Sequence, residues 1–266
     1  MEIECQQEGD PSRALRFAAA GGVEPLRSRD GAEKLTKWGL AEACVALRFR
    51  YAGALGEGAA ALLDFFNDAD VQAALAREGA GERARLVACP RGAYSRVEFE
   101  ALHTTAVDLG LFQRLKERRL VAEHGGLRKC MDETYDGATV GTLLGDLLLN
   151  PESEHAGLFS EADKRELLYV LLRWLCVGGA LNQCEDNIQP YYDLLKQLYK
   201  ALVTVVKRPD TNAIEVTSKA YLVRQLDGSH EGLFAEDNTN NLALLVFSPA
   251  SRTVTYLNSS FIPFLR

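Results

Sequence analysis

The chain has 266 residues and a formal net charge of −7, with 47% hydrophobic and 25% charged residues. These values are typical of a soluble globular protein, and a chain of this length buries about three quarters of its unfolded surface without disulfides or metals. The charge is evenly spread, because residues 1–150 hold 19 basic and 23 acidic residues, and residues 151–266 hold 11 and 14. No region has the basic excess of a nucleic-acid-binding domain, so we expect no nucleic-acid partner.

The N-terminal segment, MEIECQQEGD, is acidic and polar and lacks the basic and apolar regions of a secretory signal. The longest apolar run, LLYVLLRWLCV, contains Arg173 and is shorter than the roughly 18 residues that a membrane-spanning helix needs. We therefore expect a cytosolic protein with no membrane partner. The six cysteines form no C-x-x-C pair, and in a reducing compartment such residues are mostly small buried side chains.

The first part of the chain predicts two strands and a helix. RALRFAAAGG, at 13–22, is typical of a short strand that ends in glycines. Asp30 and Glu33 resemble a capping box, which predicts a helix through about residue 43. The run CVALRFRY, at 44–51, alternates apolar and basic residues, so it predicts a strand with one solvent-facing side.

The next segments mix helical and strand patterns. Two helices are predicted in the ranges 57–66 and 71–79, separated by the breaker NDAD. Residues 82–107 are typical of two strands around a Pro-Arg-Gly turn. Amphipathic helices are predicted over 108–121 and 138–149.

The second half has clearer boundaries. Ser160 and Asp163 predict a capped helix over 161–177 that ends at Gly178. Pro190 is typical of a first helical position, and the following helix has an apolar stripe made of Tyr191, Leu194, Leu195, Leu198, Leu202 and Val205.

Strand patterns follow at 213–223, 242–247 and 253–257, and SPASR makes a hairpin-length connection between the last two. The predicted fold class is therefore α+β, with helices packed on antiparallel strands and a C-terminal helical pair followed by a three-stranded meander. We expect a flexible N-terminus over residues 1–12 and a single domain over 13–266, with two subdomains, 13–150 and 155–266, as the alternative.

No motif predicts catalysis, a cofactor or a metal. The sequence has neither a phosphate-binding P-loop nor an H-E-x-x-H zinc motif. Asp132–Gly137 resembles the start of a calcium loop, but Leu143 stands where the bidentate Glu is required. The four histidines are scattered. The enzymatic alternative is a cysteine nucleophile assembled by folding, for which Cys184 is a better candidate than Cys176, whose helix end we expect to be buried.

Two polar segments remain as candidates for binding a protein. A basic cluster is interrupted by acids, which favours a solvated face over an acidic partner; its members are Arg114, Lys116, Arg118, Arg119, Arg128 and Lys129. The second segment lies within LCVGGALNQCED, where Gly178 ends one helix and a long polar link leads to Pro190. Such links often carry recognition, although their side chains also cap helix ends. The candidate partner-binding residues are Asn182, Gln183, Glu185, Asp186 and Tyr192.

The block over residues 158–206, with LFSEADKRELLYVLLRWLCVGGALNQCEDNIQPYY, resembles the signature region of the cilia- and flagella-associated protein 300 family. Weaker matches include Arg16-Phe17, Trp38, Phe65-Phe66 and Lys129-Cys130, so the resemblance extends over nearly the whole chain. Cys184 stands where the family pattern has an aromatic residue, which weakens the case for Cys184 as a nucleophile.

The resemblance implies a non-enzymatic adaptor or assembly factor for the outer and inner dynein arms of motile cilia and flagella. It implies action in cytoplasmic preassembly, in delivery by intraflagellar transport, or in both. The expected partners are dynein preassembly factors, axonemal dynein components or intraflagellar transport proteins, and the expected locations are the cytoplasm and the axoneme. The alternatives are a permanent structural component of the axoneme and a cysteine-dependent enzyme.

Overall fold

A six-stranded antiparallel sheet forms the centre of the computed structural model, which describes residues 15–80, 86–179, 185–208, 210 and 214–262. The strand order is β1-β2-β10-β9-β8-β3. The strands are β1 (Arg16–Gly22), β2 (Cys44–Ala52), β3 (Val97–Leu102), β8 (Lys219–Leu226), β9 (Leu242–Ser248) and β10 (Thr253–Ser259). Because β10 pairs with β2, the three C-terminal strands lie between strands from the first part of the chain.

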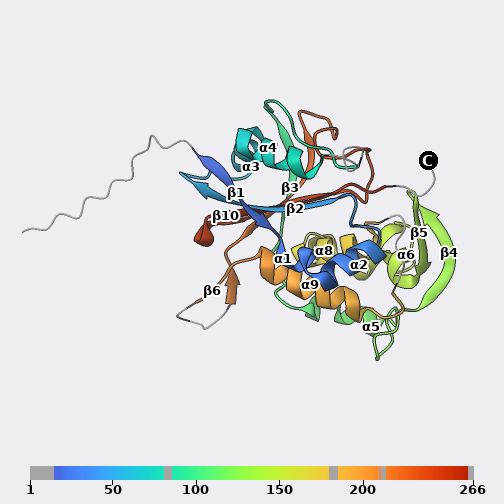
Figure 1. Cartoon of the computed structure of the whole chain (residues 1–266). Coiled ribbons are helices and arrows are strands. Elements are labelled where there is room, and N and C mark those ends of the chain that lie inside the picture. Colours follow the sequence, from blue (N-terminus) through green and yellow to red (C-terminus); the bar gives the residue numbers. More distant parts are fainter. Residues whose placement is uncertain (1–14, 81–85, 180–184, 209, 211–213, 263–266) are drawn as a thin grey trace, which may run out of the picture.

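Both faces of the sheet are buried. Along β9, Leu244 and Val246 belong to one hydrophobic core, while Leu245 and Phe247 belong to another. Successive side chains of a strand point to opposite faces, so the two cores lie on opposite sides of the sheet. A sheet that is apolar on both faces needs a layer on each, and the helices supply these two layers (Figure 1).

The thinner layer consists of α3 (Ala59–Asn67) and α4 (Ala69–Glu78). The carboxylate of Asp68 caps α4 by accepting hydrogen bonds from the backbone N–H groups of Asp70 and Val71 at 2.9 and 3.0 Å. The ring of Phe65, on α3, lies 5.3 to 5.8 Å from four other aromatic rings, those of Phe17, Phe49, Phe66 and Tyr256. This aromatic cluster attaches α3 to the sheet.

The thicker layer covers the other face. Its helices are α1 (Glu24–Arg27), α2 (Arg29–Lys37), α5 (Gln113–Glu117), α6 (Leu143–Leu149), α7 (Glu161–Lys164), α8 (Leu167–Val177) and α9 (Gln189–Leu202). Helix α8 is buried at nine of its eleven residues, so it forms the centre of this layer. Two small sheets flank the layers, β4 (Lys129–Tyr135) with β5 (Ala138–Thr142) and β6 (Val205–Lys207) with β7 (Ile214–Val216). Short 3-10 turns occupy Leu109–Phe112, Ala156–Leu158 and Pro249–Ser251.

The predicted α+β class is confirmed, including the helical pair α8–α9 and the meander β8–β9–β10 that follows it. The capping box is also confirmed, since Ser160 Oγ accepts from the Asp163 backbone N–H at 3.2 Å and the Asp163 carboxylate accepts from the Ser160 N–H at 2.9 Å. Within the described ranges, no helix combines the length and apolarity needed to cross a membrane.

Two predicted helix starts are wrong. Helix α2 begins at Arg29, one residue before Asp30, because its N-cap is Ser28, whose Oγ accepts a hydrogen bond from the Gly31 N–H, and it ends at Lys37. The segment at 138–149 begins as β5 and becomes helical only at Leu143. Asp136 and Gly137 both have positive φ angles, which suits a tight hairpin turn between β4 and β5.

Other predicted elements are shorter or divided. The helix predicted over 161–177 is broken before Leu167, because the buried Glu166 carboxylate accepts hydrogen bonds from Thr105 and Ala106. The predicted helix at 108–121 is a 3-10 turn followed by α5, and β3 is the only strand in the described part of 82–107. Helix α9 begins one residue before Pro190 and ends at Leu202, so Val205 leaves the apolar stripe and lies in β6, 50% exposed.

The aromatic cluster around Phe65 predicts a large stability effect. Replacing Phe65, which is 0% exposed, by Ala should lower the free energy of unfolding by about 3–5 kcal/mol, since the cavity adds to the lost apolar transfer. Urea unfolding followed by circular dichroism measures this change. The matched Met131→Ala variant removes a side chain that is 82% exposed and should change stability by less than about 0.5 kcal/mol. Equal losses in the two variants would contradict the assignment of the core.

Candidate partner-binding site

The glycine pair at the end of α8 is required by two close backbone approaches, one within the helix and one to the segment after α2. A Cβ atom on Gly179 would lie 2.0 Å from the carbonyl oxygen of Trp38, and one on Gly178 would lie 2.4 Å from the carbonyl oxygen of Trp174. Real Cβ atoms do not approach so closely, so both positions need glycine for space rather than for a left-handed conformation. Gly178 therefore does end the helix as predicted, and Gly179 seats that end against the segment after α2.

The side chain of Glu185 contacts the same segment, at the end of α2. Its carboxylate accepts a hydrogen bond from Trp38 Nε1 at 3.0 Å and forms an ion pair with Lys37 Nζ at 2.7 Å. The Glu185 backbone N–H donates to the Tyr191 hydroxyl at 3.4 Å, and the rings of Tyr191 and Trp38 lie 4.6 Å apart. With 12% of its side chain exposed, Glu185 ties the link to the end of α2 instead of facing solvent.

The residues after Glu185 are held from the other side by the turn at 122–129. The Leu127 N–H donates to the Asp186 carbonyl and the Ile188 N–H donates to the Gly125 carbonyl, both at 2.9 Å. Asn187 Nδ2 donates to the His124 carbonyl at 3.0 Å. The segment 185–189 therefore has a defined conformation fixed by backbone and side-chain hydrogen bonds.

Apart from Glu185, the candidate residues fall into three groups. Asn182 and Gln183 lie outside the described residues, so their placement stays a prediction. Asp186 is 89% exposed and accessible to a partner. Tyr192 is half-buried, with its ring stacked at 5.8 Å on that of Phe112, and burial raises the pKa of its hydroxyl. Of the described candidates, Asp186 alone presents most of its side chain to solvent.

Asp186 belongs to an exposed charge pair. Its carboxylate lies 2.8 Å from Lys129 Nζ, at the start of β4, and Lys129 is 59% exposed. The hydrogen bond and the charge of Lys129 hold the pKa of Asp186 below its usual value, with a smaller contribution from Lys37. Asp186 is thus ionised at neutral pH and presents a fixed negative charge beside a positive one.

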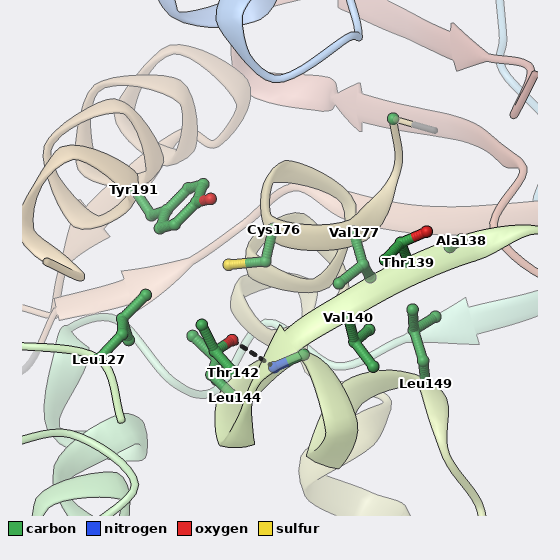
Figure 2. Close-up of a pocket in the computed structure, with 12 residues that line it drawn as sticks. Leu127, Ala138, Thr139, Val140, Thr142, Leu144, Leu149, Cys176, Val177 and Tyr191 are labelled. Atoms are coloured by element: carbon green, nitrogen blue, oxygen red, sulfur yellow. Dashed lines mark hydrogen bonds between the residues drawn. The ribbon is translucent and has the colours of Figure 1, made fainter. Parts of the chain in front are cut away.

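A small cavity lies beneath this segment, between α8, α9 and the β4–β5 hairpin. Figure 2 shows Cys176, Tyr191 and Val140 around it, together with the hydrogen bond that the Gly145 N–H donates to Thr142 Oγ1 at 3.1 Å. The cavity has a volume of about 20 Å³, enough for roughly one water molecule. Its size suits an internal packing gap rather than a substrate site.

The enzymatic alternative gains no geometric support from the described residues. Cys184 lies outside them, and Cys176 is 6% exposed in a cavity whose lining includes no histidine. Burial raises the pKa of the Cys130 thiol, and the carboxylates of Asp146, Asp132 and Glu133 raise it further, which disfavours the reactive thiolate. In the part of the chain that the structure describes, no three His, Cys, Asp or Glu residues gather as a metal site would require.

The basic cluster is partly engaged within the protein. Arg114 pairs with Asp163 at 2.8 Å and lies over the ring of Phe159, at 5.2 Å from its centroid. Lys116 donates to the Glu123 carbonyl at 3.1 Å. With Lys129 bound to Asp186, three of the six predicted members have intramolecular partners, so the cluster is not one uniform cationic surface.

Comparison with known proteins identifies the family of the chain. The family model described as cilia- and flagella-associated protein 300 matches residues 16–259, which include the whole central sheet and both sides of the Glu185 junction. The chain belongs to this family. A relative from Chlamydomonas reinhardtii, named cilia- and flagella-associated protein 300, is 34% identical over 240 residues, which cover 87% of this chain and 91% of the relative.

A second relative of the same name, from Paramecium tetraurelia, is 32% identical over 201 residues, covering 76% of this chain and 75% of the relative. No solved structure matches the chain significantly. Membership of the cilia- and flagella-associated protein 300 family confirms the predicted resemblance and supports a role in cilia or flagella.

Three residues that fix this site are not among the candidates predicted from the sequence: Lys37, Trp38 and Tyr191. Trp38 is one of only two tryptophans and was part of the resemblance to the cilia- and flagella-associated protein 300 family, so it was visible as a matched position. Its partner Glu185 is 147 residues away, and no local spacing predicts that contact. The same distance in sequence concealed that Glu185 is a structural anchor.

The Trp38–Glu185 contact predicts a measurable coupling. The Trp38→Phe variant keeps an aromatic side chain, although a smaller one, and removes the donor, while Glu185→Ala removes the acceptor. In a double-mutant cycle by urea unfolding, we expect a coupling energy of about 1–3 kcal/mol, the range for a hydrogen bond to a partly buried charge. Pairing Trp38→Phe with Glu231→Ala, an exposed acid elsewhere, should give additive losses within about 0.5 kcal/mol. Additive losses of unfolding free energy in both cycles would contradict the role of Glu185 as a structural anchor.

Proposed function

We propose that the protein is a non-enzymatic adaptor or assembly factor for the outer and inner dynein arms of motile cilia and flagella. It acts in cytoplasmic preassembly, in delivery by intraflagellar transport, or in both. Its partners are dynein preassembly factors, axonemal dynein components or intraflagellar transport proteins. The observation that carries the proposal is the family match over residues 16–259.

The form of the link supports recognition by a rigid surface. Segment 185–189 is held by Lys37 and Trp38 on one side and by the turn at 122–129 on the other. A surface that is already ordered before binding loses little conformational entropy when a partner docks. Asp186 and Lys129 present an exposed pair of opposite charges there, and such pairs select partners by complementarity.

The discriminating variant is Asp186→Lys alone. The combined change of Glu185 and Asp186 to Lys is a poor test, because Glu185→Lys places a cation against Lys37 and removes the acceptor for Trp38. At Asp186 the backbone carbonyl holds the link in place, and the substitution keeps it. The ion pair with Lys129 is lost, but both side chains are exposed, so this pair adds little to stability. Glu231→Lys is the matched control, since it makes the same charge change at another exposed acid.

The experiment is a pull-down from the cytoplasm of cells that are growing cilia, with immobilised full chain and identification of eluates by mass spectrometry. We expect wild type and Glu231→Lys to retain dynein chains, assembly factors or transport subunits. The Asp186→Lys variant should retain at least about fivefold less of these proteins, because it replaces an attraction between Asp186 and the partner by like-charge repulsion.

The outcomes separate the possible functions. Equal retention by all three proteins would keep the adaptor and remove Asp186 from its interface. If no dynein, assembly or transport protein is retained by wild type, the adaptor proposal fails. Resistance to detergent extraction from isolated axonemes would then favour a permanent axonemal component over a transported factor.

A further inference from the structure

A second polar surface lies apart from the link, where the outer part of the sheet meets α6, α7 and α8. It is a groove of about 850 Å³, and we call it the Arg173 groove. The side chains on which its chemistry depends are Glu100, Arg165, Arg173, Trp174, Arg224 and Asn240. Four basic and two acidic residues line it, a formal balance of +2 in a chain whose net charge is −7.

The two acids neutralise only part of this positive charge. Glu161 pairs with Lys164 at 2.8 Å. Glu100 is shared, since its carboxylate oxygens lie 2.7 Å from Arg165 and 3.7 Å from Arg224. One carboxylate between two guanidinium groups leaves an excess positive charge at the mouth of the groove.

Arg173 adds a cation that has only neutral acceptors. Its guanidinium donates to the carbonyl oxygens of Leu148 and Thr239, both at 3.2 Å, and to Asn240 Oδ1 at 2.8 Å. Among the described residues, no carboxylate lies within ion-pair distance of it. Burial lowers the pKa of this guanidinium and the charge of Arg224 lowers it further, while Tyr169 and Asp136 oppose the shift.

Two buried side chains that line the groove also have unused donors. Trp174 and Asn240 are each 2% exposed, and neither Trp174 Nε1 nor Asn240 Nδ2 has a hydrogen-bond partner in the described structure. A buried N–H without an acceptor costs free energy, but these two nitrogens are closed off from solvent, so a molecule in the open groove does not reach them. It is the excess positive charge of the lining that points to a ligand with negative charge.

The remaining lining narrows the class of ligand. Leu102, Leu222 and Val170 contribute apolar surface between the charged groups. A nucleic acid would be expected to meet a larger basic excess. Alternating carboxylates, backbone carbonyls and aliphatic side chains match this lining better. We propose that the Arg173 groove binds an acidic, extended segment of a partner protein, with a carboxylate at Arg173 and a second between Arg165 and Arg224.

This proposal deepens the adaptor function and rests on it for its biological role, but its test is independent. The probe is a panel of fluorescein-labelled peptides of ten residues in which Glu and Leu alternate or occur in pairs, and its control is the same panel with Gln in place of Glu. Fluorescence anisotropy with the full chain should show binding of the Glu peptides that weakens as salt is raised, and binding of the Gln peptides at least about tenfold weaker.

Two variants test the site itself. Arg165→Ser with Arg224→Ser changes exposed or partly exposed groups at the mouth and should weaken binding about tenfold or more. Asn240→Asp places a carboxylate beside Arg173 in nearly the same shape, so the internal acid should compete with the peptide. The Asn240→Asp variant should weaken peptide binding, while its free energy of unfolding should equal or exceed that of wild type. This result separates loss of the site from loss of the fold.

The matched control is Arg91→Ser with Arg96→Ser, two exposed arginines outside the groove, which should bind like wild type. Absence of binding by every Glu peptide, equal binding of the Gln panel, or unchanged binding by the groove variants would each overturn the proposal. Equal competition by an oligothymidylate of the same charge would assign the groove to polyanions in general and overturn the peptide assignment.

Peptide binding without retained ciliary proteins in the pull-down would keep the groove and reject the adaptor. Retained ciliary proteins without peptide binding would reject only the groove.

Discussion

The burial of β9 and β10 on both faces is the constraint on which the other elements depend. Leu244 and Leu245 are neighbours in sequence, yet each is 0% exposed in a different core. A strand of this kind is stable only when apolar layers cover both of its faces, and the helices from the rest of the chain supply them. The packing of α8 in the thicker layer fixes where its last turn meets Trp38, and hence where the link to α9 begins.

The link shows how a polar segment becomes part of a fold. Glu185 contributes a carboxylate that satisfies the indole N–H of the fully buried Trp38 and pairs with the partly exposed Lys37. Removal of either partner would leave a polar group with no substitute, so this contact specifies the position of the link more than it adds net stability. Asp186, the next residue, faces the solvent, so of two adjacent acids one fixes the link and the other is accessible.

Local patterns predicted much of the fold because local physics determines those parts. The Ser160 capping box, the alternating strand at 44–51 and the hairpin connection at 248–252 each depend on residues close in sequence. The break before Leu167 was not predictable in this way, since it depends on Glu166 reaching Thr105 and Ala106. The same holds for the site: the link and its glycines were found from sequence, but the direction of the Glu185 side chain is set by a residue 147 positions away.

The pairing of β2 with β10 has a consequence for biosynthesis. Arg50 lies opposite Thr253, so about 200 residues separate two strands that touch, and the centre of the sheet closes only when almost the whole chain is present. At about 5–20 residues per second, the ribosome leaves the apolar β2 without this neighbour for roughly 10–40 s. During that interval the nascent chain exposes surface that chaperones recognise. A stop codon before β10 would therefore remove the centre of the sheet rather than a dispensable tail, and the product would be a substrate for degradation.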